Sequence, residues 1–148
     1  MQEINIQHNP YDRVRNLSPE KLNKKIDKKT NQLLHGIVSQ GADAVRARIK
    51  KLDKEWDIDR AVMLISSTVI FSQLISAYKR RNKNMLWGPL IHSPLLFMHA
   101  TLGWCPAVPV LRQLGFRTRF EIEEEKDELI RVLAHEDPLS EWQVYGKG

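Results

Sequence analysis

Three residues with side chains that can bind a metal or react lie in one apolar segment, and two of them are histidines. His92 and His99 are seven residues apart, so on one helix they share a face and stand about 10.5 Å, or two turns, apart. That separation is too large for one metal ion on a straight helix. Two haems, or one metal shared with other chains, remain possible, as does proton or quinone chemistry. The ordinary alternative is a pair of neutral histidines bonded to Ser, Thr or a backbone carbonyl across a helix interface.

The third residue is Cys105, the only cysteine of the chain. A single cysteine excludes a disulfide framework and a multi-thiolate metal site. Cys105 follows the apolar segment, at the predicted C-terminus of a helix, where the helix dipole disfavours a thiolate. We therefore expect Cys105 to pack, with redox or sulfur chemistry as the alternative. The sequence contains no Gly-rich phosphate loop, Ser/His/Asp signature or zinc spacing, and it predicts no enzyme and no bound cofactor apart from the possible haem.

The charged residues that could position these groups are unevenly distributed. Residues 61–111 contain no acid and only four bases, Lys79, Arg80, Arg81 and Lys83. Uncharged stretches of 18 and 28 residues, 61–78 and 84–111, flank this basic cluster. A helix needs roughly 20 apolar residues to cross the hydrocarbon core of a bilayer. The pattern predicts a membrane hairpin of two helices, with a soluble hairpin buried in a helical core, or a shallow hairpin that does not cross, as alternatives.

Local signals divide the remaining chain into helices. Pro19 and Glu20 after Ser18 predict a helix start, and Gly41 predicts a break. Asp57 or Asp59 can cap the first apolar helix. Further on, Gly115 should end a short amphipathic turn, and Thr118 to Glu121 forms a capping box for a charged helix. The predicted ranges are an irregular arm (1–17), basic amphipathic helices (18–57), the membrane hairpin (58–105), the short turn plus charged helix (106–136) and a tail (137–148).

Apolar stripes along the polar helices predict their packed faces. The stripes comprise Leu22, Ile26, Leu33, Ile37 and Val38, then Val45, Ile49, Leu52 and Trp56, and finally Ile122, Leu129, Ile130 and Leu133. The acidic run Glu121–Glu128 should form the exposed side of the last helix, or pair with the N-terminal bases. The predicted fold class is all-α, a transmembrane helical hairpin flanked by amphipathic cytoplasmic helices.

Small, aromatic and basic residues have separate expected roles in this arrangement. Close helix contacts are expected from Ser66, Ser67, Ser72, Ser76, Gly103 and Cys105. Aromatic side chains at the membrane interface should be Tyr78, Trp87 and Trp104. Anionic lipid headgroups should contact Lys21, Lys24, Lys25, Lys28, Lys29, Arg46, Lys50 and Lys54. These bases could instead grip nucleic acid in a soluble helical protein, but interleaved acids and the lack of nearby aromatics disfavour nucleic acid as a partner.

Three short motifs add a family resemblance. Asp59-Arg60 precedes the first apolar helix, Gly103-Trp104-Cys105-Pro106 ends the second, and Val110–Lys126 follows. Together they resemble the YgaP-like two-helix transmembrane domain family of bacteria, over about half of the chain. The resemblance implies an inner-membrane hairpin that pairs with copies of itself. The chain has no room for the rhodanese domain of some members, and its first apolar helix carries Ser and Thr where that family has glycine.

The distribution of bases predicts the orientation. Ten bases lie near the outer ends of the two apolar helices, against four in the turn between them, and no signal peptide is evident. We expect both termini in the cytoplasm of a bacterium and the turn outside the inner membrane. The predicted role is structural, either a self-associating module or a small accessory subunit of a larger membrane complex. The alternatives are an electron-transfer subunit that binds haem or metal through His92 and His99, and the soluble nucleic-acid binder.

Overall fold

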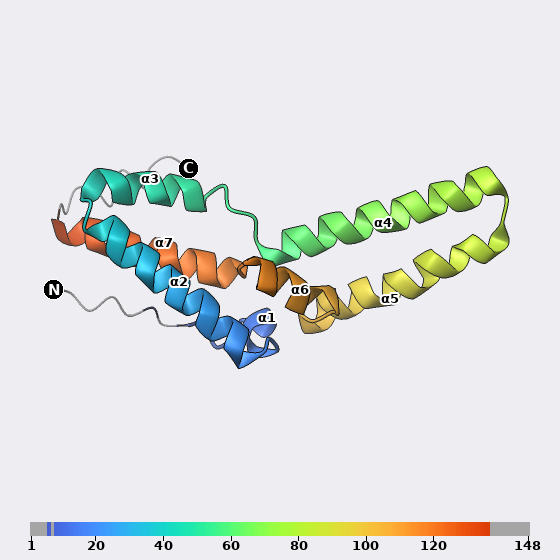
Figure 1. The fold of residues 1–148 in the computed structure, drawn as a ribbon, viewed down its shortest axis with the longest axis horizontal. Helices are drawn as coiled ribbons and strands as arrows, with labels where there is room; N and C mark the ends of the chain where they lie inside the picture. Colours follow the sequence, from blue (N-terminus) through green and yellow to red (C-terminus); the bar gives the residue numbers. More distant parts are fainter. Residues whose placement is uncertain (1–5, 7, 137–148) are drawn as a thin grey trace. The chain divides into compact units, whose positions relative to one another are not determined.

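The computed structural model describes residues 6 and 8–136, and within them every regular element is a helix (Figure 1). The elements are α1 (Arg13–Asn16), α2 (Glu20–Val38), α3 (Ala42–Leu52), α4 (Ile58–Arg80), the 3-10 helix η1 (Lys83–Leu86), α5 (Trp87–Leu102), α6 (Ala107–Leu114) and α7 (Arg119–Glu136). The predicted all-α class is confirmed. The predicted tail, 137–148, and most of residues 1–7 lie outside the described part of the chain.

The helices form two compact units. Among the described residues, unit 1 comprises 6, 8–9, 20–55 and 119–136, and therefore contains α2, α3 and α7. Unit 2 comprises residues 10–19 and 56–118, and contains α1, α4, η1, α5 and α6. The structure thus groups α6 with the apolar helices and α7 with the basic ones, although both helices fall in the predicted range 106–136.

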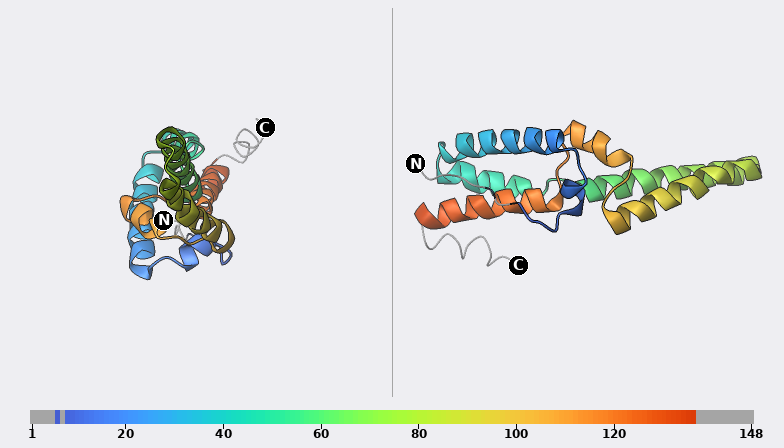
Figure 2. Two further views of the ribbon diagram at one scale, coloured as in Figure 1. Left: turned by 90° about the vertical axis from the view of Figure 1, so that its right-hand side faces the viewer. Right: turned by 90° about the horizontal axis from the view of Figure 1, so that it is seen from below.

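Unit 1 is a bundle of three helices that bury one apolar core (Figure 2). Its buried members are Leu34, Val45, Ile49, Leu52, Ile122, Leu129, Ile130 and Leu133. Burying this stripe from each helix is the main stabilising contribution expected for such a small bundle. The predicted stripe of α7 is confirmed in full, because all four of its residues are buried.

Two predicted core positions are wrong. Leu33 is 42% exposed and Leu34 is buried instead, because Ile26, Thr30 and Leu34, spaced by four, form the packed face of α2. Trp56 lies beyond the end of α3 and is half exposed. Its ring stacks under the Arg60 guanidinium, 5.4 Å from the ring centre, in a cation–π contact within unit 2.

The acidic run on α7 is only partly exposed, so the expectation of a solvated face is wrong for two residues. Glu121 and Glu125, one turn apart, are buried. Arg48 of α3 donates to both oxygens of Glu125, at 2.7 and 3.1 Å, and Lys126 donates to Asp53. The alternative prediction, pairing with the N-terminal bases, is therefore confirmed within the chain.

Arg48 is partly desolvated, but its bonds to Glu125 outweigh that burial and raise the pKa of the guanidinium.

An exposed ion pair supports the first turn of α2. Glu20 and Lys24 stand one turn apart, with Nζ and Oε1 2.7 Å from each other. The hydrogen bond and the charge of Lys24 lower the pKa of Glu20, and Glu20 raises the pKa of Lys24 in return. This contribution to helix stability is present above the ordinary pKa of a glutamate and is lost as the pH falls through the lowered one.

Unit 2 is built on two helices that run in opposite directions. α4 and α5 lie side by side, joined at one end by Arg81, Asn82 and η1 (Figures 1 and 2). At the other end, α6 and α1 close an apolar core of Val14, Ile58, Ala61, Val62, Cys105, Val108 and Leu111. The Asp57 carboxylate caps α4 by accepting from the Arg60 N–H at 2.7 Å, one of the two predicted caps. Gly115 ends α6 in the left-handed conformation, as predicted.

Candidate functional site

The largest unusual feature of unit 2 is the exposed apolar surface of α4, η1 and α5. Thirteen large apolar side chains of these helices are exposed: Met63, Leu64, Ile65, Phe71, Leu74, Ile75, Tyr78, Leu86, Trp87, Leu90, Ile91, Phe97 and Leu102. Phe71 and Phe97 are 66% and 70% exposed. Contiguous apolar patches of this kind are rare on monomeric soluble proteins and mark interaction or membrane surfaces.

One of the described helices, α4, is long and apolar enough by itself to cross a membrane. Its 23 residues extend for about 34 Å, slightly more than the hydrocarbon core. A core helix of a soluble protein can have the same length and composition, but it is mostly buried, whereas only 22% of the apolar segment of α4 is buried. The segment Lys83–Leu102 meets the same criterion only together with α6, from which it is bent by 67°.

All charge between Arg60 and Arg112 lies at the joined end of α4 and α5. We call Lys79, Arg80, Arg81 and Lys83 the basic tip, and all four side chains are exposed. Arg81 ends α4 with a positive φ of 50°, and the Asn82 side chain caps η1 by accepting from the Asn84 N–H at 3.0 Å. These two residues reverse the chain sharply, so the four bases crowd onto one short turn.

At the opposite end of the two helices, an acid and a histidine meet. His99 is 3% exposed, and its Nε2 lies 3.1 Å from Asp59 Oδ1 on the first turn of α4. Its Nδ1 is buried and has no hydrogen-bond partner among the described residues. The sequence offers, as one alternative, a His99 that forms a hydrogen bond across a helix interface to Ser, Thr or a backbone carbonyl. The structure shows such a contact, but its partner is a carboxylate. Periodicity could not reveal it, because the two residues are 40 positions apart.

The same end of unit 2 is closed by contacts around α1. Arg13 donates to the Thr101 carbonyl at 2.6 Å, and Thr118 donates to the buried Asp12 carboxylate. Gly103 adopts a φ of 78°, and a Cβ placed there would stand 2.8 Å from Arg13 Cβ. Cys105 is buried in the apolar core, consistent with a packing role.

The histidines do not form a recognisable metal centre in the described residues. No group of three or more His, Cys, Asp or Glu side chains that could hold a metal ion occurs there. His92 is partly exposed on α5, and His99 already faces Asp59. The structure therefore gives these two residues different surroundings, although they lie on the same helix.

The serines predicted for helix contacts occupy two kinds of position on α4. Ser66 is buried inside the chain. Three other hydroxyls donate to carbonyls of their own helix: Ser67 to Leu64, Ser72 to Thr68 and Ser76 to Ser72, at 2.7–3.1 Å. Because their hydrogen-bonding capacity is satisfied locally, these hydroxyls can lie in an apolar environment at low cost.

The predicted interface residues are found mostly at the surface. Tyr78 and Trp87 are exposed beside the basic tip, and Trp104 is partly exposed at the other end of the helix pair. The predicted headgroup bases lie on unit 1, where Lys21, Lys24, Lys25, Lys28, Lys29, Lys50 and Lys54 are exposed and Arg46 is partly buried. Of these, Lys24 pairs with Glu20, and Arg46 pairs with Asp43 at 3.2 Å.

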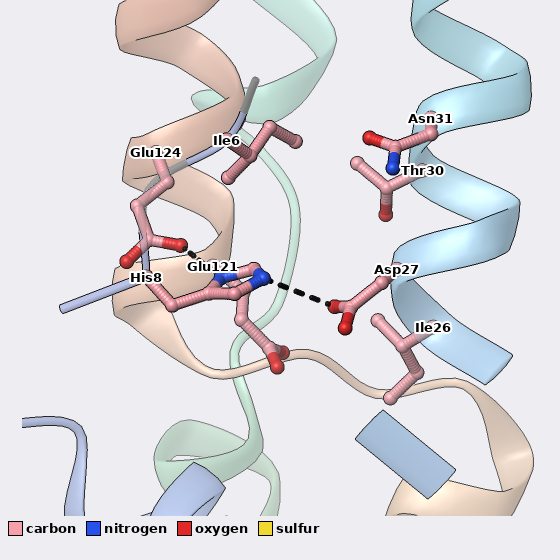
Figure 3. A pocket seen from close by; sticks show the side chains of 8 residues that line it. All are labelled: Ile6, His8, Ile26, Asp27, Thr30, Asn31, Glu121 and Glu124. Atoms are coloured by element: carbon pink, nitrogen blue, oxygen red, sulfur yellow. Dashed lines mark hydrogen bonds and ion pairs between the residues drawn. The ribbon is translucent and has the colours of Figure 1, made fainter. Parts of the chain in front are cut away.

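Unit 1 contains a small polar pocket that sequence reasoning missed. Figure 3 shows His8 between two acids, with Nδ1 2.9 Å from Glu124 and Nε2 3.6 Å from Asp27. The cavity of about 70 Å³ is also lined by Ile6, Ile26, Thr30, Asn31 and Glu121. Since Asp27 and Glu124 are paired with His8, the pocket serves best to attach residue 8 to α2 and α7.

Two of the three motifs that carry the family resemblance lie at the same end of the α4–α5 pair. Asp59 and Arg60 begin α4, and Gly103 to Pro106 follow α5, at the same end of the helix pair. Comparisons of the chain with protein-family models, curated protein sequences and solved structures find no match. Membership of the two-helix family stays a prediction.

Proposed function

We propose that this protein is an integral membrane protein whose α4–α5 pair inserts into a lipid bilayer as a transmembrane hairpin. The observation that supports it best is the exposed apolar surface of α4 and α5, on helices that carry no charge between Arg60, in the first turn of α4, and the end of α5 except at the basic tip. Lipid tails remove this surface from water, and each large side chain transferred contributes roughly 1.5–3 kcal/mol. A purely aqueous role would leave Phe71, Phe97 and their neighbours in water.

The proposed role is structural. Unit 1 has a core of its own and a lysine-rich surface, features that suit a cytoplasmic body held against the anionic lipids of a bacterial inner membrane. Thr68, Ser72 and Ser76, spaced by four, give α4 a small-residue face for packing against a second copy, or against a subunit of a larger membrane complex. The proposed role is therefore assembly, and no chemical step is assigned to any residue. Both termini lie in the cytoplasm in this arrangement.

Fractionation of cells that express the full chain tests insertion. We expect the protein in the membrane fraction after washing with high salt and with alkaline carbonate, because apolar contacts with lipid resist both treatments. A chain that is released by salt alone would be held by charge only. A chain that stays in the supernatant without detergent, as a single species, would contradict the proposal.

Cysteine labelling tests the orientation. Asn84→Cys in a Cys105→Ala background places one thiol at the tip without removing the Asn82 cap, and Ala47→Cys places one on the exposed face of α3. We expect an impermeant maleimide to label position 84 in intact cells and position 47 only after lysis. Labelling of both positions only after lysis would contradict the transmembrane hairpin and favour a shallow one.

A further inference from the structure

We propose that the basic tip is a binding site for the phosphate groups of anionic phospholipids. The proposal rests on the proposed membrane insertion and assigns a ligand to its far end. Lys79, Arg80, Arg81 and Lys83 are exposed and lie within five positions of one turn. No acid occurs between residues 60 and 120, and the carboxylate of α4, Asp59, lies on the first turn at the opposite end of the helix, so it does not neutralise them.

The residues around the tip favour a lipid surface over other anions. Tyr78 and Trp87, which flank the four bases, are 85% and 65% exposed. Such amphipathic rings prefer the depth of the headgroups, with the hydrocarbon just below them. Further along the helices the exposed side chains become aliphatic, including Ile75, Leu90 and Ile91. Charge, aromatic ring and aliphatic chain thus follow one another in the order in which a bilayer presents phosphate, interface and hydrocarbon.

The turn holds the bases in a compact arrangement. Arg81 occupies the left-handed region, and the Asn82 side chain and carbonyl bond the N–H groups of Asn84 and Met85. A turn that is already ordered loses less conformational entropy when its four cations bind a ligand than a flexible loop would. Nucleic acid offers the same phosphate chemistry, but the apolar residues on both sides of the tip would then remain in water.

The test compares lipids near the tip. The full chain, as Cys105→Ala with Asn84→Cys, carries a fluorophore at position 84 and is inserted into vesicles of phosphatidylcholine and phosphatidylglycerol. Either lipid, in turn, carries a nitroxide quencher on its headgroup. We expect stronger quenching by labelled phosphatidylglycerol than by labelled phosphatidylcholine, with the difference reduced by salt. Equal quenching by the two lipids would overturn the lipid site while leaving insertion intact.

Charge variants make the assignment specific. Lys79→Gln, Arg80→Gln, Arg81→Asn and Lys83→Gln together remove the charge, and Asn tolerates the left-handed position. Since one base near an anionic surface favours binding about fivefold, loss of all four should weaken binding by roughly 600-fold, so the preference for phosphatidylglycerol should disappear. The control exchanges each Lys for Arg and each Arg for Lys, and should keep the preference.

Two further outcomes would separate the possible failures. Absence of quenching by either labelled lipid would place the tip away from every headgroup and contradict membrane insertion itself, and the lipid site with it. Binding of a short DNA duplex that is lost in the charge-removed variant, without any lipid preference, would overturn the lipid site in favour of nucleic acid.

Discussion

At the scale of single residues, the Arg48–Glu125 pair is the contact with the largest expected effect on stability. Glu125 is fully buried on α7, and Arg48 bonds both of its oxygens. Arg48→Ala leaves a buried carboxylate without this cation, and should lower the free energy of unfolding by about 3–5 kcal/mol. Urea unfolding of the protein in detergent micelles, followed by circular dichroism, measures the loss.

The matched control for this pair lies on the surface of α7. Arg119 also pairs with a glutamate, Glu123, at 2.8 Å, but both side chains are exposed. Arg119→Ala should therefore cost under about 1 kcal/mol. In the double variant Arg48→Met/Glu125→Met, the loss in the free energy of unfolding should be smaller than the sum of the losses in Arg48→Met alone and Glu125→Met alone. Equal effects of Arg48→Ala and Arg119→Ala would show that the buried pair has no special importance.

His99 and Asp59 give a second prediction at this scale. Asp59→Ala removes the acceptor that faces the buried Nε2, and should destabilise unit 2 by about 1–3 kcal/mol. Asp59→Asn keeps an oxygen that can accept a hydrogen bond from the ring, so it should cost less. Thermal unfolding in micelles compares the two variants, and losses of the same size would show that the hydrogen bond contributes little.

At the scale of elements, the glycines that follow α5 and α6 test how α1 packs. Gly103 and Gly115 both end a helix in the left-handed region, with φ of 78° and 96°. A Cβ at Gly115 would meet nothing within 4 Å, whereas one at Gly103 would meet Arg13 at 2.8 Å and the Val14 backbone at 3.3 Å. Gly115→Ala should therefore cost about 1–2 kcal/mol of conformational strain, and Gly103→Ala roughly 1–3 kcal/mol more.

Gly88, in contrast to Gly103, has a flexible side chain as the neighbour that an added Cβ would meet. A Cβ there would lie 2.9 Å from the end of the Gln73 side chain. A flexible amide can move aside, so Gly88→Ala should be nearly neutral in the same unfolding measurement. If Gly88→Ala proves as harmful as Gly103→Ala, the packing of α4 on α5 is tighter than the structure shows.

Local signals in the sequence predict the helices well, and their pairing poorly. Pro19, Gly41, Asp57 and Gly115 mark helix ends through the conformations and caps that single residues favour. The contacts of Arg48 with Glu125 and of His99 with Asp59 join positions 77 and 40 residues apart. No periodicity within one helix contains that information. For the same reason the sequence predicts an exposed Glu125, since the cation that pairs with it, Arg48, lies 77 positions away in the chain.

At the scale of the whole molecule, a charge placed among the exposed apolar residues distinguishes a membrane protein from a soluble one. Phe71 lies near the middle of α4 and is exposed. Phe71→Lys should oppose insertion by about 3 kcal/mol, so the equilibrium constant for insertion should fall by roughly a hundredfold and the fraction in membranes should decrease. Carbonate washing of membranes from cells that express the variant measures that fraction.

Leu33 of unit 1 supplies the control. It is also an exposed apolar residue, at 42%, but on a helix that is charged on its other faces. Leu33→Lys should leave the membrane fraction unchanged, because this side chain does not reach the hydrocarbon in the proposed arrangement. If Phe71→Lys remained in the membrane as fully as Leu33→Lys, the apolar surface of α4 would require another partner.

The discontinuity of unit 1 has a consequence for synthesis on the ribosome. α2 and α3 are translated before residues 56–118, the larger part of unit 2, and α7 is translated after them. At about 5–20 residues per second, the nascent chain waits several seconds between completing α3 and supplying Leu129 and Leu133. During that interval α4 and α5 emerge while the bundle still lacks its third helix. With the proposed insertion, membrane targeting would precede closure of unit 1, and a stop codon before residue 119 would leave its apolar faces open to chaperones and proteases.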